Sequence, residues 1–312
     1  MQTVQTGNGT MKRVLITGGS GFLGAWILRR LHAQGTAARV FDVNADRSKV
    51  AEIAGADAAA RVEWREGDIR RTDDVVRAAD GCDGVIHLAG VLTPACIADP
   101  VRGAEINLIG TINVFEAARV HRLASIVYAS SAGVFGPEDP VHPFPTTLYG
   151  AYKLAGEGVA RSYHAVHAMA SIGFRPLVVY GPGRDAGLSA GPSIACREAA
   201  MGRAYVHPFS GRSGFVYVED CADLFVRALA SRPTDAAVYN VIGEHASADD
   251  VIAQLRRIAP GVNLEVSGPP LPIAPGIAET GLDAAFPGRR RTSLADGLRA
   301  TFDYYRNRAT AR

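Results

Sequence analysis

The stretch VLITGGSGFLG, from Val14 to Gly24, joins an apolar run to a cluster of glycines. Its first four residues are apolar or β-branched, as in a buried strand, and apolar residues at helical spacing follow the glycines. This order predicts a strand, a tight turn and a helix. In such a unit Gly18, Gly21 and Gly24 allow a sharp turn, the close approach of a pyrophosphate and close helix packing, while unpaired N–H groups at the helix start face the anion. The stretch therefore predicts a dinucleotide-binding site.

The composition of the chain excludes several classes of protein. Its 312 residues are enough for one large α/β domain or for a domain with a smaller lobe. The formal net charge of +2 lacks the basic footprint of nucleic-acid-binding proteins, and no apolar run approaches the roughly 18 residues that suggest a membrane span. We therefore expect no nucleic-acid partner and no membrane partner.

Cysteine usage and the first ten residues bear on where the protein works. The four cysteines are far apart and form no CxxC pair, which favours a reduced, cytoplasmic protein without a metal site. The first ten residues lack the basic start and the apolar centre of a secretion signal, so we interpret 1–10 as a flexible N-terminal extension. The cysteines are Cys82, Cys96, Cys196 and Cys221.

Apolar strands alternate with helical patterns through the first 181 residues. GVIHLAG at 84–90, SIVYASSAGVFG at 125–136 and SIGFRPLVVYGPGR at 171–184 contain apolar runs with little polar alternation. Such strands indicate a sheet covered on both faces, as parallel sheets are. The alternation of strand and helix predicts an α/β fold with a doubly wound parallel sheet, the Rossmann fold. His87 lies inside the first of these strands, where we interpret it as a buried core residue.

The regular alternation of strand and helix patterns ends after Gly181, where a long glycine-rich loop follows the last of these strands. We assign 11–181 to the NAD-binding domain and expect strands within 215–243 to complete its sheet. The remaining segments, 182–214 and 244–312, are predicted to form a smaller, mostly C-terminal substrate-binding lobe that closes over the cofactor.

An acidic residue closes the second predicted strand. Asp42 ends the apolar part of ARVFDVN at 38–44 and lies eighteen positions beyond Gly24. A carboxylate there suits hydrogen bonds to both ribose hydroxyls of an adenosine and repels a 2′-phosphate, so NAD is favoured over NADP as the cofactor. The alternative is that Asp42 only begins a polar loop.

Three side chains could act together as one catalytic unit. Tyr149 and Lys153 are one turn apart on a predicted helix, and Ser131 follows a predicted strand end. The free pKa of a tyrosine is about 10, and a nearby lysine together with a positive nicotinamide ring is expected to lower it. The serine would hold the substrate oxygen while the tyrosine moves its proton and the nicotinamide exchanges hydride. Tyrosine and lysine at this spacing also occur by chance, but the glycine turn and the Ser-Ser strand end favour catalysis.

Several motifs together resemble those of one family. They are TGGSGFLG at the glycine turn, HLAG at 87–90, NLIGTINVFEAA from Asn107, SSAGVFG at 130–136, YGAYK at 149–153 and the tail TSLADGLRATFDYYR. In this combination the chain resembles the extended short-chain dehydrogenase/reductase family, and more narrowly its NAD-dependent epimerase/dehydratase branch. The resemblance covers nearly the whole chain.

The resemblance implies roles for individual residues. Tyr149 would be the acid/base, and Lys153 would bind the nicotinamide ribose and lower the pKa of the tyrosine. Ser131 would contact the substrate, and Asn107 would support the hydrogen-bond network of the site.

The resemblance also implies a cofactor-binding surface and an assembly. Asp68-Ile69 would flank the adenine. Members of the family usually dimerise through two long helices per subunit, here expected at 101–120 and 148–168, so we expect a homodimer. The expected cofactor-binding residues are Gly18, Gly21, Phe22, Leu23, Gly24, Asp42, Asp68, Ile69, Leu88, Ala89, Gly90, Asn107, Ala129, Tyr149, Lys153, Pro176 and Leu177.

Departures from the family pattern bear on the substrate. Sugar-nucleotide dehydratases have Thr-Asp-Glu where this chain has Ser-Ala-Gly at 131–133, so the acid and base for eliminating water are missing. Nucleotide-sugar epimerases typically have an asparagine in place of Val178 and an arginine in place of Ser213. Such an arginine clamps a diphosphate through bidentate bonds, and Arg212 is one residue out of register but could replace it. These losses favour a smaller substrate without a nucleotide.

The loops after Gly90 and Gly181 are expected to hold this substrate. Arg184 is the candidate partner for a substrate carboxylate or hydroxyl, and the alternative is a surface arginine that caps its loop. The full set of expected substrate residues is Val91, Thr93, Ser131, Ala132, Arg184, Ser189 and Arg212.

Three functions remain open from the sequence. The leading hypothesis is NAD-dependent oxidation of a secondary alcohol on a small polyhydroxylated substrate, such as a sugar, a sugar acid or a hydroxy acid. The first alternative is a nucleotide-sugar epimerase with tightly held NAD, in which hydride leaves and returns to the other face. The second is a non-catalytic NAD-sensing protein, which the presence of Ser131, Tyr149 and Lys153 disfavours.

Overall fold

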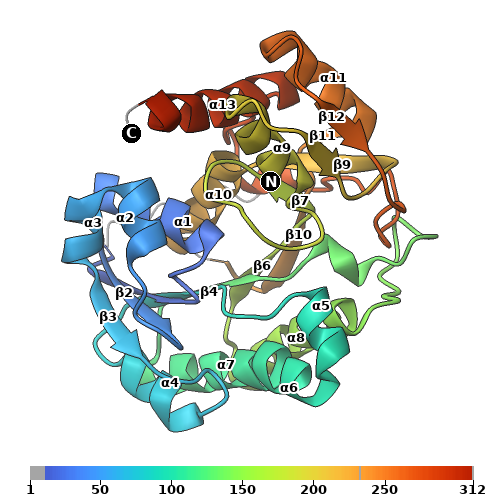
Figure 1. Cartoon of the computed structure of the whole chain (residues 1–312). Coiled ribbons are helices and arrows are strands. Elements are labelled where there is room, and N and C mark those ends of the chain that lie inside the picture. Colours follow the sequence, from blue (N-terminus) through green and yellow to red (C-terminus); the bar gives the residue numbers. More distant parts are fainter. Residues whose placement is uncertain (1–10, 232, 311–312) are drawn as a thin grey trace.

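A seven-stranded parallel sheet forms the centre of the molecule (Figure 1). The structure, a computed structural model, describes residues 11–231 and 233–310, so the predicted extension at 1–10 lies outside it. The strand order is β10-β6-β5-β4-β1-β2-β3, and the predicted doubly wound parallel sheet is confirmed. The strands are β1 Arg13–Thr17, β2 Ala37–Asp42, β3 Glu63–Glu66, β4 Gly84–His87, β5 Ser125–Ala129, β6 Ser171–Pro176 and β10 Ala236–Val241.

Helices cover both faces of this sheet (Figure 1). One face carries α1 Phe22–Ala33, α2 Ser48–Ala54, α3 Ala56–Arg61 and α10 Val218–Ala230. The other face carries α4 Thr72–Ala79, α7 Gly110–His121 and α8 Leu148–His167. Because side chains alternate along a strand, Val14 and Ile16 of β1 belong to the apolar core under α1 and α10, whereas Leu15 belongs to the core under α4 and α7. Because both faces of the sheet are buried, the sequences of these strands are nearly continuous apolar runs.

A smaller lobe is built largely from the C-terminal half of the chain. It holds a three-stranded sheet in the order β11-β9-β7 and a strand pair β12-β8. The strands are β7 Val178–Tyr180, β8 Tyr205–His207, β9 Arg212–Tyr217, β11 Glu244–Ser247 and β12 Leu264–Val266. The helices are α9 Gly191–Ala200, α11 Ala248–Ile258, α12 Leu282–Ala285 and α13 Leu294–Thr310. Of the segment 215–243, β10 therefore joins the main sheet, whereas the residues at its start belong to β9 of the second sheet.

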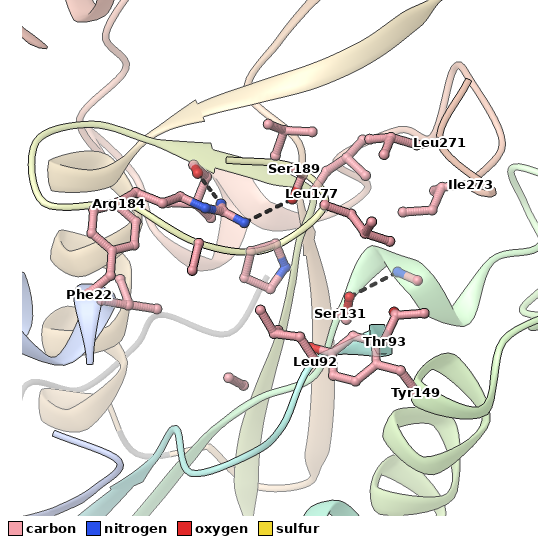
Figure 2. Close-up of a pocket in the computed structure, with 18 of the residues that line it drawn as sticks. Phe22, Leu92, Thr93, Ser131, Tyr149, Leu177, Arg184, Ser189, Leu271 and Ile273 are labelled. Carbon is pink, nitrogen blue, oxygen red and sulfur yellow. Dashed lines mark hydrogen bonds between the residues drawn. The ribbon is translucent and has the colours of Figure 1, made fainter. Parts of the chain in front are cut away.

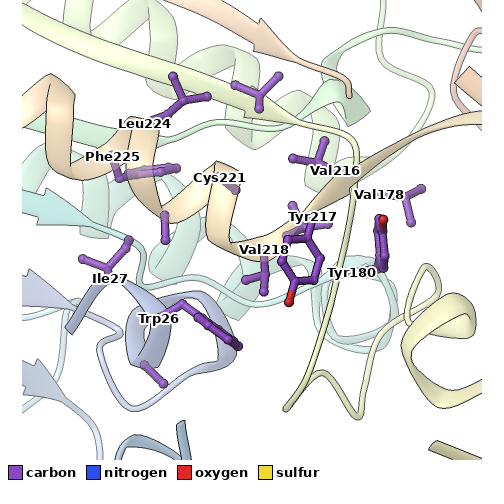
Figure 3. Packing of buried hydrophobic residues seen from close by; sticks show 14 of the residues in the cluster. Trp26, Ile27, Val178, Tyr180, Val216, Tyr217, Val218, Cys221, Leu224 and Phe225 are labelled. Carbon is purple, nitrogen blue, oxygen red and sulfur yellow. The ribbon is translucent and has the colours of Figure 1, made fainter. Parts of the chain in front are cut away.

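The two parts of the molecule share one apolar core. Trp26 and Ile27 of α1 and Phe225 of α10 belong to the same cluster as Tyr180 of β7 and Tyr217 of β9 (Figure 3). Side chains of the smaller lobe and of the cofactor-binding domain thus pack together in this core. The packing fixes the strand ends of the lobe relative to those of the main sheet.

The segment before α7 is helical but interrupted. It runs through α5 Thr93–Ala98 and α6 Pro100–Ala104 into a π-helical turn, η1 Glu105–Ile109, and then into α7. Single π turns inside helices are frequent at functional sites, and this one contains the buried Asn107. A 3-10 turn, η2 Ala132–Val134, follows β5.

Two further features concern the part of the chain that the structure describes. No helix there is both long and apolar enough to cross a bilayer. No group of three histidine, cysteine, aspartate or glutamate side chains gathers there in a way that could hold a metal ion. All four cysteines are buried and free.

Candidate active site

The glycine turn between β1 and α1 has the shape that a dinucleotide requires. Gly18 has a φ of +71°, and a Cβ atom at this residue would lie 2.6 Å from the backbone nitrogen of Ala89. A Cβ at Gly24 would lie 2.5 Å from the carbonyl oxygen of Gly19, so only glycine lets the helix approach the turn this closely. Gly21 is the N-cap of α1 and no described side chain caps the helix, so the first N–H groups are free for an anion. The turn therefore fits a pyrophosphate.

Asp42 lies beside this turn at the end of β2. Its Oδ2 accepts hydrogen bonds from the backbone N–H of Ser20 at 3.2 Å and from the Ser20 hydroxyl, and its Oδ1 accepts from the Val43 N–H at 2.8 Å. These bonds fix the carboxylate next to the glycine turn. The position fits the ribose of an NAD molecule whose pyrophosphate rests on the start of α1.

Helix α8 begins one residue before Tyr149, the predicted acid/base. The hydroxyl of Thr147 caps the helix by accepting from the Gly150 N–H at 3.1 Å. A Cβ at Gly150 would lie 2.1 Å from the carbonyl oxygen of Gly133, so glycine allows the first turn of α8 to pack directly on η2. This contact brings the ring of Tyr149 next to the hydroxyl of Ser131, and both line the same cavity (Figure 2).

Lys153 lies one turn further along α8, buried behind Tyr149. Its Nζ donates to the carbonyl oxygen of Ala129 at 2.8 Å and is 5.7 Å from the centre of the Tyr149 ring. Burial lowers the pKa of Lys153 to about 8. Burial also raises the pKa of Tyr149 above its ordinary value, and interaction with the Ser131 hydroxyl opposes that rise. The protein alone therefore shifts the tyrosine pKa in the direction opposite to the expected one.

Asn107 fixes the chain that leaves β4. Its Nδ2 donates to the carbonyl oxygens of Val91 and Gly103, both at 3.0 Å, and its Oδ1 accepts from the Val91 N–H at 3.2 Å. A Cβ at Gly90 would lie 2.6 Å from this Oδ1. Asn107 thus acts on the backbone beside the site.

A cavity of 460 Å³ lies at the carboxyl ends of the parallel strands, and many of the predicted site residues line it. Among the expected substrate residues, Thr93, Ser131, Arg184 and Ser189 line it. The expected cofactor residues that line it are Gly21, Phe22, Leu23, Ala129, Tyr149, Pro176 and Leu177.

Three expected substrate residues lie elsewhere. Ala132 is fully buried in a small apolar cluster with Val134. Arg212 is exposed at the start of β9 and does not line the cavity, so it does not replace the missing diphosphate clamp. The backbone of Val91 is occupied by Asn107, and its side chain does not reach the cavity.

The pair Asp68-Ile69 also lies outside the cavity lining. The carboxylate of Asp68 binds Arg70 at 2.6 Å, and this arginine holds the pKa of Asp68 below its usual range. Ile69 is buried, and its carbonyl oxygen accepts from the Asn113 side chain at 2.9 Å. Their contact with an adenine remains a prediction.

Arg184 is the cation nearest the catalytic residues on the cavity wall. Its Nη1 donates to the carbonyl oxygen of Val179, its Nη2 donates to the Ser189 hydroxyl at 2.8 Å, and its guanidinium lies 5.9 Å from the centre of the Phe22 ring (Figure 2). Within 11–231 and 233–310 it forms no ion pair. Burial lowers the pKa of Arg184 to about 10, and the guanidinium and Tyr149 are close enough to affect each other's pKa. An anion bound in the cavity would relieve this uncompensated charge.

The loop that carries Arg184 is bound to the cofactor domain. Lys49 of α2 donates to the carbonyl oxygen of Gly183 at 2.8 Å and pairs with Asp185 at 2.6 Å. Trp26 of α1 donates to the carbonyl oxygen of Pro182 at 3.0 Å. These bonds hold the loop over the cavity.

Sequence reasoning missed several residues of the cavity wall. Thr147 carries a helix-cap signal, a threonine three residues before a close-packed glycine, which could have placed it there. Lys49 carries no motif. Leu271, Pro272 and Ile273 come from the proline-rich segment GPPLPIAPG, which carries no motif for a binding site, because contacts made by a distant loop leave no local pattern.

Fold and site together define a dinucleotide-binding enzyme of the short-chain dehydrogenase type. Over residues 14–241 the sequence matches the NAD dependent epimerase/dehydratase family, and the chain belongs to that family. Its cofactor is accordingly NAD.

Individual relatives carry more than one activity. The UDP-glucose 4-epimerase of Mycolicibacterium smegmatis is 29% identical over 228 residues, which cover 69% of this chain and 72% of that protein. The uronate dehydrogenase of Agrobacterium fabrum is 33% identical over 162 residues, which cover 49% of this chain and 56% of that protein. The crystal structure of the Thermus thermophilus UDP-glucose 4-epimerase in complex with NAD has a TM-score of 0.80 and 27% identity, over 94% of this chain and 99% of that one.

Proposed function

We propose that the protein oxidises a secondary alcohol on a small substrate that carries no nucleotide, with transfer of hydride to NAD. The observation that carries the proposal is the charge of the cavity wall. A nucleotide sugar brings a diphosphate with two negative charges, yet Arg212 lies outside the cavity and Val178 supplies no polar group. Lys49 already pairs with Asp185, which leaves Arg184 as one cation for one negative charge. A sugar acid or a hydroxy acid has that charge.

The chain's own groups can carry out the proton chemistry. Tyr149 takes the hydroxyl proton of the substrate on its phenolate oxygen, and the Ser131 hydroxyl holds the substrate oxygen as it becomes a carbonyl. Lys153 is held by Ala129 behind the tyrosine, and its positive charge together with that of the bound nicotinamide would oppose the burial that raises the pKa of Tyr149. When bound, NAD supplies the hydride acceptor. The products are a ketone, NADH and a proton that leaves through Tyr149.

A second candidate is an epimerase of nucleotide sugars that keeps its NAD between turnovers. The names of the M. smegmatis relative and the T. thermophilus neighbour favour this function over the first. The same tyrosine, serine and lysine would serve, since epimerisation by this route also begins with removal of hydride.

Net formation of NADH separates the two candidates. The purified protein would be mixed with NAD and a panel of sugars, sugar acids and hydroxy acids while absorbance at the NADH band is recorded. Formation of NADH supports the dehydrogenase. NAD-dependent interconversion of UDP-hexoses without net NADH supports the epimerase, and it should be accompanied by thermal stabilisation by UDP, which a small-substrate dehydrogenase lacks.

A further inference from the structure

The side of the cavity formed by the segment between β12 and α12 is apolar. Leu271 and Ile273, from the segment between β12 and α12, lie together on one side of the cavity, and Arg184 lies on the other (Figure 2). Leu188, from the loop that carries Arg184, and Leu92, from the chain after β4, add further apolar surface and are both about half exposed. In the view of Figure 2, Ser131 lies with Thr93 and Tyr149 below Leu177, while Arg184 lies to one side and Leu271 and Ile273 lie to the other.

Most polar side chains on the cavity wall already have partners. The Ser130 hydroxyl donates to Glu157 at 2.5 Å, and the Ser189 hydroxyl accepts from Arg184. The Thr147 hydroxyl caps α8. Among the described residues, the wall contains no asparagine, glutamine, histidine or glutamate.

The polar side chains of the described wall that keep hydrogen-bonding capacity for a substrate include none from the segment 271–273. They include Thr93, Ser131, Thr147, Tyr149 and Ser189, together with the charged Lys49, Arg184 and Asp185. Ser131 and Tyr149 are taken by the alcohol that reacts. A substrate arm that lies on Leu271 and Ile273 would bury any further hydroxyls without side-chain hydrogen-bond partners from that segment, which is unfavourable.

We infer that the substrate is a hydroxy acid with a single reacting alcohol and one apolar arm. Its carboxylate binds Arg184, its alcohol meets Ser131 and Tyr149, and its arm packs on Leu271 and Ile273. This inference rests on the proposed function and narrows it, because sugars and sugar acids lack such an arm. In the reaction the alcohol carbon loses hydride to NAD and the alcohol oxygen loses its proton to Tyr149, which leaves a keto acid.

Two six-carbon acids test the inference directly. Hexanoates with one hydroxyl, at C2 or C3, differ from gluconate mainly in the polarity of the arm. With NAD present, kcat/KM from NADH formation should be at least about tenfold higher for a monohydroxyhexanoate than for gluconate or galacturonate, in line with the worth of a few buried methylenes. Hexanoate, which has the acid and the arm but no alcohol, should inhibit competitively and raise the melting temperature of the NADH complex, whereas gluconate should not.

Variants of the wall provide the second test. Ile273→Ser and Leu271→Ser should each lower kcat/KM for the monohydroxyhexanoate several-fold and reduce its preference over gluconate. Val206→Ser is the matched control, because Val206 is an exposed residue of β8 that does not line the cavity. It should leave both values unchanged.

The outcomes separate this inference from the function on which it rests. If NADH forms faster with gluconate or galacturonate than with a monohydroxyhexanoate, the inference of an apolar arm is wrong, but the proposed dehydrogenase function still holds. The Ile273 and Leu271 variants give a second outcome that overturns the apolar arm. In that outcome they lose activity toward the hexanoates but keep the same preference for a monohydroxyhexanoate over gluconate. If no acid reduces NAD and UDP-hexoses are epimerised, the proposed function fails, and the inference fails with it.

Discussion

Glu157 and Arg175 form a buried ion pair beside the predicted catalytic residues, one helical turn after Lys153. Arg175 Nε donates to Glu157 Oε1 at 2.7 Å and Arg175 Nη2 donates to Oε2 at 2.6 Å, while the glutamate is fully buried. Glu157 lies one turn after Lys153 on α8, and Arg175 directly precedes Pro176 of the cavity wall on β6. The pair therefore couples the helix that carries the acid/base to a strand end that faces the cofactor.

Removal of the Glu157 charge should destabilise the protein strongly. Glu157→Gln leaves a largely buried guanidinium without its counter-charge, and breaking such a pair costs about 3–5 kcal/mol. Urea unfolding followed by circular dichroism measures the loss. Asp303→Asn is the control, because Asp303 pairs with Arg306 at the surface and its loss is expected to cost less than about 1 kcal/mol. Equal losses in the two variants would contradict a structural role for the buried pair.

Substitution of two neighbouring tyrosines of α8 tests whether the protein is an enzyme or a non-catalytic NAD sensor. Tyr149→Phe should lower kcat by about 10²–10⁴-fold, because the group that takes the alcohol proton is removed. The affinity for NADH, measured by its fluorescence, should change little. Tyr152→Phe is the matched control, since among the described residues the Tyr152 hydroxyl bonds only to the carbonyl oxygen of Pro100 and does not line the cavity. Unchanged turnover in Tyr149→Phe would favour a non-catalytic protein.

Lys153 should reduce stability at neutral pH. Its pKa is about 8 in the folded protein against an ordinary value of 10.5, so between these values the unfolded chain binds more protons. Stability should accordingly rise with pH across this window. Below pH 8 the buried charge costs about 3 kcal/mol, of which about 1 kcal/mol is offset by the hydrogen bond to Ala129.

The variant Lys153→Met removes this cost. It should be more stable than the wild type by about 2 kcal/mol at pH 7. The difference should reach zero at about pH 9.5 and reverse by about 1 kcal/mol toward pH 10.5, because the neutral lysine keeps its hydrogen bond to Ala129. Denaturant unfolding at pH 7, 8, 9 and 10 measures it. Lys12→Met, at an exposed position, should show no such pH-dependent difference. A Lys153→Met protein less stable than the wild type at pH 7 would contradict the assignment.

Local patterns predicted the fold of the cofactor half and its NAD cofactor correctly, while the roles of its individual residues stay predictions. The glycine turn, Asp42 and the paired Tyr149 and Lys153 each depend on residues close in sequence, whose periods and spacings fix their geometry. His87 was likewise interpreted correctly: its ring is buried between the hydroxyls of Thr17 and Thr111 at 2.7 and 3.1 Å, and burial lowers its pKa to about 3.

The substrate half could not be predicted in the same way. Leu271 and Ile273 reach the cavity only because β8, β9 and β12 place a distant loop there, and no local period records that placement. Arg212 was predicted to contact the substrate because it lies one residue from the position of a diphosphate-binding arginine. In the structure its side chain is exposed to solvent at the start of β9. Burial raises the pKa of Tyr149 in the protein alone, and the sequence could not indicate this because burial depends on packing by distant residues; the expected lowering with NAD bound stays a prediction.

Exposed apolar residues on two helices test the expected homodimer. Val120 of α7 and Val166 of α8 are more than half exposed although the two helices pack on each other. If 101–120 and 148–168 form the interface, Val120→Asp and Val166→Asp should each shift the mass measured by light scattering from two chains toward one. Val206→Asp, on a strand of the smaller lobe, should leave the mass unchanged. A wild-type mass of one chain at micromolar concentration would rule out this dimer.

The pair Lys49 and Asp185 should slow the release of NADH. Lys49 belongs to α2 of the cofactor domain and Asp185 to the loop that covers the cavity, so we expect the 2.6 Å contact to open when the cofactor leaves. A partly exposed pair contributes about 0.2–1 kcal/mol, so Asp185→Asn should speed NADH dissociation by up to about fivefold. Stopped-flow displacement of NADH measures the rate, and added salt should speed the wild type more than the variant. Asp57→Asn, which removes a surface pair with Arg61, is the control. Equal dissociation rates in Asp185→Asn and the wild type would show that the loop opens without breaking this contact.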